Sequence, residues 1–233
     1  MLKGVIPAVD SAGLIKSIRD TADERVMFLS GRLATQHLFG ADNEGLISLS
    51  EYAQYFRDVQ IATDAPLIAD GQSGFGNPLS MWNAAEEIGR SGAKYLLIND
   101  QPWPSHSAVP AGADDLPTLL GKIKAAQDGS EDSGMEVIVK LEGVQTYGLG
   151  GLIKRIKLAV KAGIHQVAVS RLNPEQLDQL AADEVFSKIG IMQDDDQLTL
   201  AKIKSVHPAF IIPVNETLKE LETYRKHIIA VEQ

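Results

Sequence analysis

The sequence contains no cysteine, no long apolar run and no excess of positive charge. Without cysteine the chain has neither a disulfide framework nor thiolate chemistry, which fits a reducing compartment such as the cytoplasm. No window approaches the roughly 20 apolar residues of a membrane-spanning helix. The first residues, MLKGVIPAVDSAG, lack the apolar core of a signal peptide. We therefore expect a soluble, cytoplasmic protein.

The charge balance is acidic. The chain has 22 Lys and Arg residues against 31 Asp and Glu residues, and its formal net charge is −9. Such a chain is repelled by nucleic-acid phosphates and by anionic lipids, so we expect neither nucleic acid nor a membrane as a partner. A local cationic pocket for a small anionic metabolite is compatible with this balance. A homo-oligomer is compatible as well, because nothing in the sequence sets the oligomeric state.

Short apolar runs alternate with helical patterns from one end of the 233-residue chain to the other. The runs are continuous rather than alternating, as is typical of buried parallel strands. Helix starts are marked by capping signals, such as Ser48 followed by Glu51, and the pair Asn77-Pro78. The expected strands are Gly4–Ala8, Arg25–Leu29, Pro66–Ala69, Tyr95–Ile98, Val137–Val139, Gln166–Val169, Lys188–Ile191 and Phe210–Ile212.

Alternating strands and helices have two common solutions, a closed barrel and a doubly wound open sheet. About eight strand–helix units in a chain of this length favour the barrel. The sequence has no linker and no low-complexity segment. We therefore predict an α/β protein, a (β/α)₈ TIM barrel in which residues 1–233 form a single domain.

In such a barrel the ligand site lies where the strands end and the βα loops begin. Polar residues follow most of the expected strands, and we expect their side chains to converge on one mouth. Strand ends are also where polar loop residues simply begin, so no single position is diagnostic. The positions are Ser30, Gly31, Arg32, Asp70, Gln72, Gly74, Asn99, Asp100, Lys140, Glu142, Arg171, Gln193, Asp194 and Asn215.

Several of these features have two interpretations. Lys140 and Glu142 share strand parity, so they point the same way and form either a structural ion pair or a catalytic pair. The glycine-rich segment at 73–76 can present N–H groups to an anion, but it is neither a Walker motif nor a dinucleotide fingerprint. His106 is either an acid–base group or a solvated loop residue. The run at 194–196 predicts an exposed helix N-terminus rather than a metal site.

Four segments together resemble the isocitrate lyase and phosphoenolpyruvate mutase superfamily. They are SGRLATQHLFGAD (30–42), ADGQSGFGN (69–77), LIND (97–100) and VIVKLEG (137–143). The resemblance covers nearly the whole chain, and it is the combination that is specific. It implies a (β/α)₈ barrel that binds a 2-oxo acid or its enolate, usually on Mg²⁺. Members of this superfamily break or form C–C or P–C bonds next to a carboxylate.

The resemblance also implies roles for individual residues. Ser30 and Gly31 would bind the anionic end of the substrate, and Asp70 would bind the metal, with Asp42 farther out. Mg²⁺ would act as a Lewis acid on the enolate oxygen. The full expectation is catalytic Asp42, Lys140, Glu142 and His106; substrate-binding Ser30, Gly31, Arg32, Gly74 and Asn99; and metal-binding Asp70, Gln72 and Asp100.

The sequence departs from the superfamily pattern at several of these positions. Gln72 and Asn99 stand where members have acidic residues, and Lys140 stands where they have arginine. The segment at 103–106 lacks the usual Lys or Cys of the gating loop. Arg32 occupies a position that is apolar or small in familiar members. These changes predict weak Mg²⁺ binding, with Arg32 taking over part of the cation's place.

Two hypotheses about function remain. The first is a lyase- or phosphonomutase-type enzyme that acts on a small 2-oxo acid, carboxylate or phosphonate through an enolate. The second is a catalytically degenerate relative that binds a small anionic ligand without turnover. The retained Asp70 and Glu142 favour the first hypothesis, and the lost carboxylates favour the second.

Overall fold

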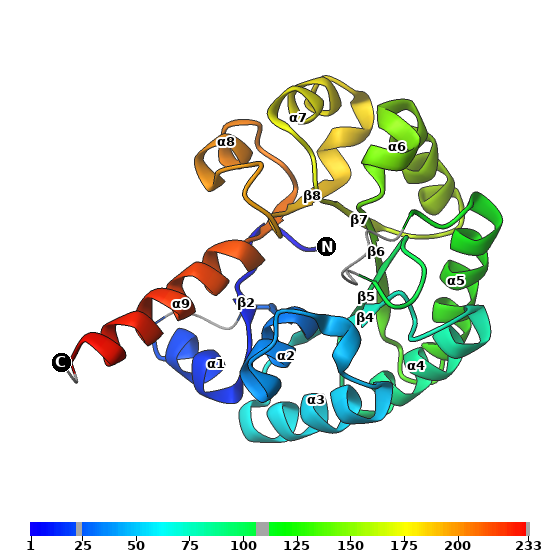
Figure 1. The fold of residues 1–233 in the computed structure, drawn as a ribbon. Coiled ribbons are helices and arrows are strands. Elements are labelled where there is room, and N and C mark those ends of the chain that lie inside the picture. The colour runs from blue at the N-terminus through cyan, green and yellow to red at the C-terminus, as the bar shows by residue number, and fades with distance from the viewer. Residues whose placement is uncertain (22–24, 106–111, 232–233) are drawn as a thin grey trace.

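The computed structural model describes residues 1–21, 25–105 and 112–231, which form a ring of helices around parallel strands (Figure 1). The strands are β1 Gly4–Val5, β2 Ala8–Val9, β3 Met27–Leu29, β4 Leu67–Gln72, β5 Tyr95–Asn99, β6 Glu136–Leu141, β7 Gln166–Val169, β8 Ile189–Met192 and β9 Phe210–Ile212. The helices are α1 Ala12–Arg19, α2 Gly31–Phe39, α3 Leu49–Thr63, α4 Pro78–Arg90, α5 Leu116–Gly129, α6 Val144–Lys161, α7 Pro174–Ala181, α8 Leu200–Ser205 and α9 Val214–Val231, with 3₁₀ turns η1 Glu44–Leu46 and η2 Glu184–Lys188.

The N-terminal segment closes the barrel. The strand order is β1-β9-β8-β7-β6-β5-β4-β3-β2, and every pairing is parallel. Strands β1 and β2 are successive parts of one extended segment that pairs with β9 and then with β3. The backbone N–H of Ile6 donates to Ile211 (2.8 Å), and the carbonyl of Pro7 accepts from Phe28 (2.9 Å). The predicted (β/α)₈ barrel is therefore confirmed, with the expected first strand divided at Pro7.

The capping signals of the sequence act as expected. Ser48 and Glu51 form a reciprocal capping box at the start of α3. Asn77 caps α4, where its side-chain oxygen accepts from two backbone N–H groups, and Pro78 is the first helical residue. Helix α2 begins directly after β3 and was not expected. Its N-cap is Ser30, whose Oγ accepts from the backbone N–H of Leu33.

The apolar core has two layers, one inside the barrel and one between the strands and the helices. Phe210 fills the interior because its neighbour Gly190 has no side chain: a Cβ there would lie 2.2 Å from the Phe210 ring. The interior layer includes Phe28, Ile68, Leu97, Ile138, Met192 and Ile212. These apolar side chains form the floor of the barrel mouth. None of the helices in the described parts of the chain has both the length and the apolarity needed to cross a bilayer.

Candidate active site

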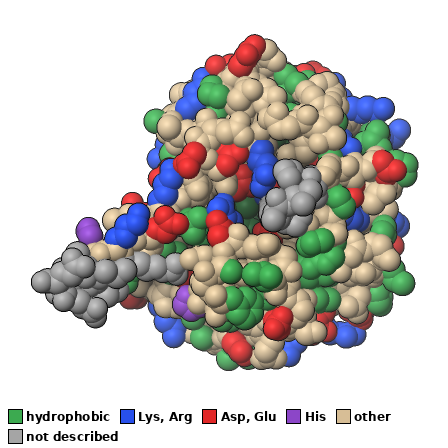
Figure 2. Space-filling model, viewed as in Figure 1, with side chains coloured by type: hydrophobic (Ala, Val, Ile, Leu, Met, Phe, Trp, Pro, Cys, Tyr) green, Lys and Arg blue, Asp and Glu red, His purple; other side chains and the backbone are tan. Residues whose placement is uncertain are grey.

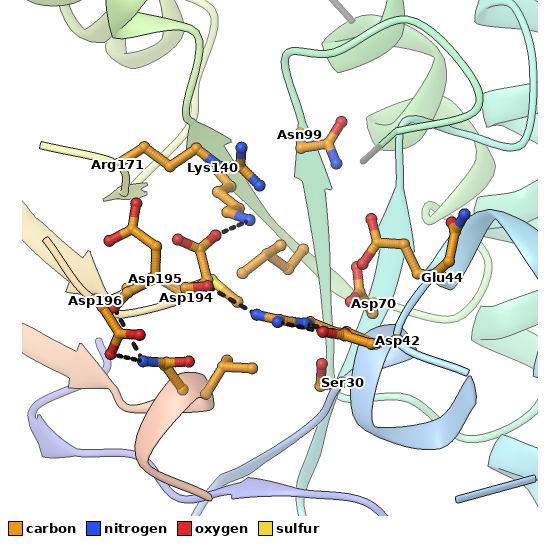
Figure 3. A pocket seen from close by; sticks show the side chains of 16 residues that line it. Ser30, Asp42, Glu44, Asp70, Asn99, Lys140, Arg171, Asp194, Asp195 and Asp196 are labelled. Carbon is orange, nitrogen blue, oxygen red and sulfur yellow. Dashed lines mark hydrogen bonds and ion pairs between the residues drawn. The ribbon is translucent and has the colours of Figure 1, made fainter. Parts of the chain in front are cut away.

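A cavity of about 390 Å³ opens at the carboxyl ends of the strands. Acidic and basic side chains gather around this hollow in Figure 2, and Figure 3 shows them pointing into it from different strands. Of the described residues, those lining it are Ser30, Arg32, Asp42, Asn43, Glu44, Asp70, Leu97, Asn99, Lys140, Arg171, Met192, Asp194, Asp195, Asp196, Val214 and Asn215. The expected convergence of strand-end residues on one mouth is therefore present.

The expected site residues divide into three groups. Those lining the cavity are Ser30, Arg32, Asp42, Asp70, Asn99 and Lys140. Five others do not line it: Gly31, Gln72 and Glu142, which contact lining residues directly, and Asp100 and Gly74, of which Gly74 packs against Met81 of α4. His106 lies outside the described residues, as does much of the loop around it.

Asp70 is held at the end of β4 by backbone groups of two elements. The N–H of Gly31 donates to Asp70 Oδ2 (2.9 Å), and the N–H of Gln72 donates to Asp70 Oδ1 (3.1 Å). Gly31 is the first residue of α2, whose N-terminus carries partial positive charge. Below, the hydroxyl of Tyr52 accepts from the Asp70 N–H and donates to the Leu29 carbonyl, both over 2.7 Å. These contacts fix a buried carboxylate at the cavity wall.

Glu44 brings a second carboxylate to the same wall. It is buried in the turn η1, and its Oε1 accepts from the hydroxyl of Ser105 (2.8 Å). The pKa of Asp70 is raised to about 7, because burial disfavours its charged form and because the negative charge of Glu44 lies nearby. The backbone N–H groups and Lys140 oppose this shift without cancelling it. Two carboxylates thus share one wall with too little positive charge between them.

Gln72 stands beside this pair. Strand β4 has an irregularity between Asp70 and Gln72, and Gln72 has a positive φ of 49°. Its side chain is fully buried, its Nε2 donates to the Glu44 carbonyl (3.4 Å), and its Oε1 has no hydrogen-bond partner among the described residues. An orphaned buried acceptor costs free energy unless a donor or cation satisfies it. Gln72 does not line the cavity, but this oxygen next to the Asp70 wall is an acceptor that a further group could use.

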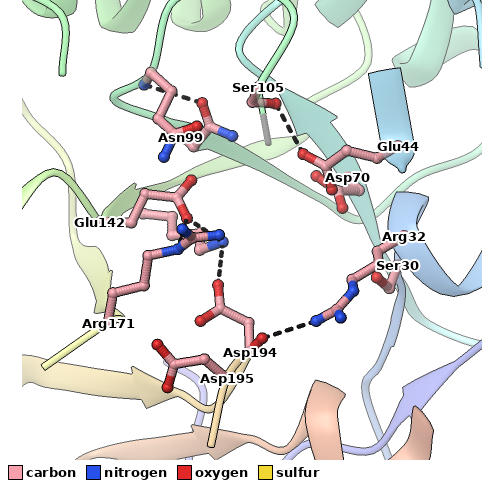
Figure 4. A network of polar contacts seen from close by, with 12 residues as sticks. Ser30, Arg32, Glu44, Asp70, Asn99, Ser105, Glu142, Arg171, Asp194 and Asp195 are labelled. Carbon is pink, nitrogen blue, oxygen red and sulfur yellow. Dashed lines mark hydrogen bonds and ion pairs between the residues drawn. The ribbon is translucent and has the colours of Figure 1, made fainter. Parts of the chain in front are cut away.

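Lys140 is the central cation of the opposite wall. Its Nζ lies 2.9 Å from Glu142 Oε2 and 2.7 Å from Asp194 Oδ2, and all three side chains are almost fully buried. Burial alone would lower the pKa of Lys140, but the charges of Asp194 and Glu142 outweigh it, so the pKa is raised. The Nε of Arg171 also lies 3.2 Å from Glu142 Oε2. The expected Lys140–Glu142 pair is thus present as part of a larger network (Figure 4).

Arg32 connects two sides of the cavity. It forms a bidentate pair with Asp42, with 2.6 Å between Arg32 Nη2 and Asp42 Oδ2. Its Nη1 donates to the backbone carbonyl of Asp194 (2.7 Å). The hydrogen bond with Asp42 raises the pKa of Arg32 further, so it remains a cation. Asp42 therefore neutralises an arginine here, and the sequence hypothesis that Arg32 replaces the metal remains a prediction.

Asp100 points away from the cavity. Its Oδ1 accepts from the backbone N–H groups of Glu142 (2.9 Å) and Gly143 (3.3 Å), and its Oδ2 accepts from the hydroxyl of Tyr147 (2.8 Å). Arg155 Nη1 lies 3.6 Å from the same Oδ2. Burial raises the pKa of Asp100, and these donors oppose that shift. Asp100 therefore holds the backbone of Glu142 in position.

The acidic run at 194–196 is not a helix N-terminus, so that expectation was wrong. Helix α8 begins at Leu200, and its N-cap is Thr199. Asp194 lies two residues after the end of β8 and turns inward to Lys140, whereas Asp196 is exposed and pairs with Lys219. Charge composition alone did not distinguish a buried partner of a lysine from a solvated helix start.

The sequence interpretation gave no role to Glu44, Arg171 or Asp194. Arg171 and Asp194 come two and three residues after an expected strand, so their positions were a usable signal. Glu44 belongs to a 3₁₀ turn some distance after β3, and no periodicity or motif marks it. Its place beside Asp70 depends on how the segment between α2 and α3 folds back over the barrel mouth.

These residues fit a hard divalent cation on the Asp70 wall. Mg²⁺ prefers oxygen ligands and is commonly held by one or two carboxylates while it keeps several waters. Asp70 and Glu44 supply two carboxylates, and Gln72 supplies an unsatisfied amide oxygen. A cage of three or more His, Cys, Asp or Glu side chains does not occur in the part of the chain that the structure describes. The fit is therefore to a cation that remains partly hydrated.

The fold and the cavity define a (β/α)₈ barrel protein with a small, highly charged ligand site. No protein-family model matches the chain. It is 30% identical to oxaloacetate decarboxylase 1 of Pseudomonas fluorescens (strain Pf0-1) over 86% of this chain and 73% of that protein. It is 28% identical to the oxaloacetate decarboxylase of Bradyrhizobium sp. (strain ORS 278) over 65% of this chain but only 54% of that protein. The chain thus spans about half the length of some curated relatives.

Solved structures show the same fold. Oxaloacetate acetylhydrolase in complex with 3,3-difluorooxalacetate superposes with a TM-score of 0.85 at 17% identity, over 99% of this chain and 82% of that one. Phosphoenolpyruvate phosphomutase from Streptomyces platensis subsp. rosaceus superposes with a TM-score of 0.81 at 17% identity, over 99% of this chain and 83% of that one. The chain belongs to the isocitrate lyase and phosphoenolpyruvate mutase superfamily, as the sequence segments indicated.

Proposed function

We propose that this chain is a lyase that acts on a small 2-oxo acid in the cavity at the barrel mouth. The observation that carries the proposal is the meeting of Asp70, Lys140 and the Glu142-bound Arg171 around one cavity of about 390 Å³. A cavity of this size has room for a small metabolite. The names of the relatives, oxaloacetate decarboxylase and oxaloacetate acetylhydrolase, support a 2-oxo acid as the substrate class.

We propose further that Mg²⁺ binds at the Asp70 wall. Asp70 and Glu44 would hold it, with the Oε1 of Gln72 as a neutral oxygen nearby. When bound, Mg²⁺ supplies a Lewis acid that stabilises negative charge developing on an enolate oxygen. Glu44 would compensate for the carboxylates that the superfamily pattern places at Gln72 and Asn99.

The chain's own residues would bind and orient the acid. Arg171 uses only its Nε on Glu142, and its two Nη groups have no partner among the described residues. A guanidinium with both Nη groups available binds a carboxylate in a bidentate way. Asn99 uses its Oδ1 to accept from the Gln101 N–H (3.1 Å), which leaves its Nδ2 to donate to a ligand oxygen. Lys140 stays protonated between two carboxylates, so it acts through its charge rather than by giving up a proton.

Calorimetric titration tests this assignment. We expect Mg²⁺ to bind the wild-type chain, and pyruvate to bind more tightly when Mg²⁺ is present. Arg171→Met should weaken pyruvate at least tenfold while leaving Mg²⁺ affinity within threefold, because a charged hydrogen bond contributes roughly 1.5–3 kcal/mol. An unchanged pyruvate affinity in Arg171→Met would refute this placement of the ligand.

A further inference from the structure

The wall around Lys140 contains a carboxylate of the chain itself, that of Asp194. Asp194 Oδ2 lies 2.7 Å from Lys140 Nζ, and both side chains line the cavity (Figure 3). Lys140 also contacts Glu142 (2.9 Å). One ammonium group thus faces two buried carboxylates of its own chain, so the negative charges around it outnumber its single positive charge.

Several contacts fix the position of Asp194. Its backbone carbonyl accepts from Arg32 Nη1 (2.7 Å). The neighbouring residue, Gln193, is fixed by its backbone N–H to Ile212 (2.9 Å) and by its side chain to Leu198 (3.0 Å). The Asp194 side chain itself is only 6% exposed. Contacts with Arg32, Ile212 and Leu198 therefore hold the backbone from which the Asp194 side chain reaches Lys140.

The other cations of the cavity are also engaged. Three cationic and six acidic side chains are among the described residues that line it. Arg32 is paired with Asp42, and Arg171 retains only its Nη groups for a ligand. Among the side chains of the cavity, Arg171 is therefore the one left to neutralise a ligand carboxylate, and a second carboxylate near Lys140 would meet the negative charge of Asp194.

Asp194 also has an unused acceptor. Its Oδ1 is buried and has no hydrogen-bond partner among the described residues, while Oδ2 faces Lys140. A buried carboxylate oxygen without a donor is costly, and a ligand O–H or N–H would remove that cost. The same oxygen that repels a second carboxylate would thus favour a ligand with a donor group.

We infer that Asp194 is a specificity-determining residue, and that the site takes a monoanionic 2-oxo acid whose far end donates a hydrogen bond, such as a hydroxyl-bearing acid, rather than a dicarboxylate. This inference rests on the proposed function and narrows its substrate class. Asp194 occupies the place of the second carboxylate and supplies the acceptor for the donor group. The site would then differ in its preference from the dianionic ligand of the oxaloacetate acetylhydrolase complex.

The experiment compares three probes by calorimetry in the presence of Mg²⁺: 2-oxobutyrate, 4-hydroxy-2-oxobutyrate and 3,3-difluorooxaloacetate. We expect the wild-type chain to bind the hydroxy acid at least tenfold more tightly than the dianion. Asp194→Asn should reduce this ratio at least tenfold by tightening the dianion, and should change 2-oxobutyrate less than threefold. Asp178→Asn removes a charge that pairs with Lys202 and does not line the cavity, and it should keep the wild-type ratio.

Every outcome of this experiment either supports the inference about Asp194 or overturns it. A wild-type chain that prefers the dianion, or an Asp194→Asn variant that weakens all three probes equally, would overturn the inference, because the residue would then be only structural. An equal effect of Asp178→Asn would assign the effect to the net charge of the chain and would also overturn the inference. If none of the probes binds any variant, the proposed function fails together with the inference, whereas binding without the expected reversal refutes the inference alone.

Discussion

The backbone N–H of Gly31 donates to Oδ2 of Asp70 over 2.9 Å, so the first residue of α2 touches the carboxylate at the end of β4. The contact requires a residue without a side chain. A Cβ on Gly31 would lie 2.9 Å from Gln72 Nε2 and 3.2 Å from Asp70 Oδ2. The glycine is therefore explained by close packing against the Asp70 wall rather than by backbone freedom.

Gly31→Ala should disturb this wall. Because the added methyl group would push on Gln72 and Asp70, we expect unfolding free energy to fall by about 1–3 kcal/mol, as for other overpacked sites, and Mg²⁺ to bind at least threefold more weakly. Denaturant titration and calorimetry measure the two effects. Gly13→Ala is the control, because Gly13 is exposed in α1 with no atom closer than 3.9 Å to its would-be Cβ. Equal behaviour of the two variants would contradict the packing argument.

Glu44→Gln tests the proposed second carboxylate of the metal site. We expect Mg²⁺ affinity to fall at least tenfold, because a charge pair about 4 Å apart is worth roughly 4 kcal/mol at an effective dielectric of about 20. Asp196→Asn is a matched control. Asp196 also lines the cavity, but it pairs with Lys219 on another side of the mouth. If both variants bind Mg²⁺ as the wild type does, Glu44 is not part of the site.

Sequence reasoning succeeded where position along a strand determines position in space. Asp70 and Lys140 occupy the ends of continuous apolar runs, so a barrel necessarily brings them to one mouth. Sequence reasoning failed where a contact depends on how a loop folds back over the barrel mouth. Glu44 reaches Asp70 only because η1 folds over the mouth, and Asp194 turns inward although its acidic neighbours suggest a solvated segment. Asp100 follows a strand too, yet its side chain points to Tyr147, and the pattern of the sequence does not specify that direction.

Folding stability without metal should depend on pH through Asp70. The pKa of this carboxyl is raised from its ordinary value of 3.8 to about 7 in the folded chain. The folded state therefore retains a proton that the unfolded state has lost between these values, so unfolding free energy should fall as pH rises from about 4 to 7. The slope for one such proton is at most about 1.4 kcal/mol per pH unit.

Denaturant titrations at several pH values measure this dependence. Asp70→Asn should reduce the slope, since an amide does not titrate. Mg²⁺ should stabilise the wild-type chain more at pH 8 than at pH 6, because it binds the charged carboxylate and competes with the proton. A wild-type slope that survives intact in Asp70→Asn would assign the proton to another group.

Tyr147→Phe separates the positioning role of Asp100 from metal binding. The variant removes the 2.8 Å hydrogen bond from the Tyr147 hydroxyl to Asp100 Oδ2. We expect a loss of about 1–3 kcal/mol in unfolding free energy, because the buried Asp100 oxygen loses a donor, with Mg²⁺ affinity unchanged within threefold. Tyr55→Phe provides a comparison, since its hydroxyl donates to the Asp10 carbonyl (2.6 Å) away from this network. A tenfold loss of Mg²⁺ affinity in Tyr147→Phe but not in Tyr55→Phe would indicate that Asp100 belongs to the metal site.

The central claim is that the cavity cleaves a small 2-oxo acid with the help of a divalent cation. The most direct test is proton NMR of the wild-type chain mixed with Mg²⁺ and a set of 2-oxo acids, including oxaloacetate and 4-hydroxy-2-oxobutyrate, to detect a pyruvate product above the rate without protein. The account predicts product from at least one acid, loss of that product on chelation of the metal, and at least a hundredfold lower rate in Lys140→Met, whose lost charge leaves Glu142 and Asp194 unpaired. Tight binding of these acids with no product from any of them would contradict the claim and leave a ligand-binding protein without turnover.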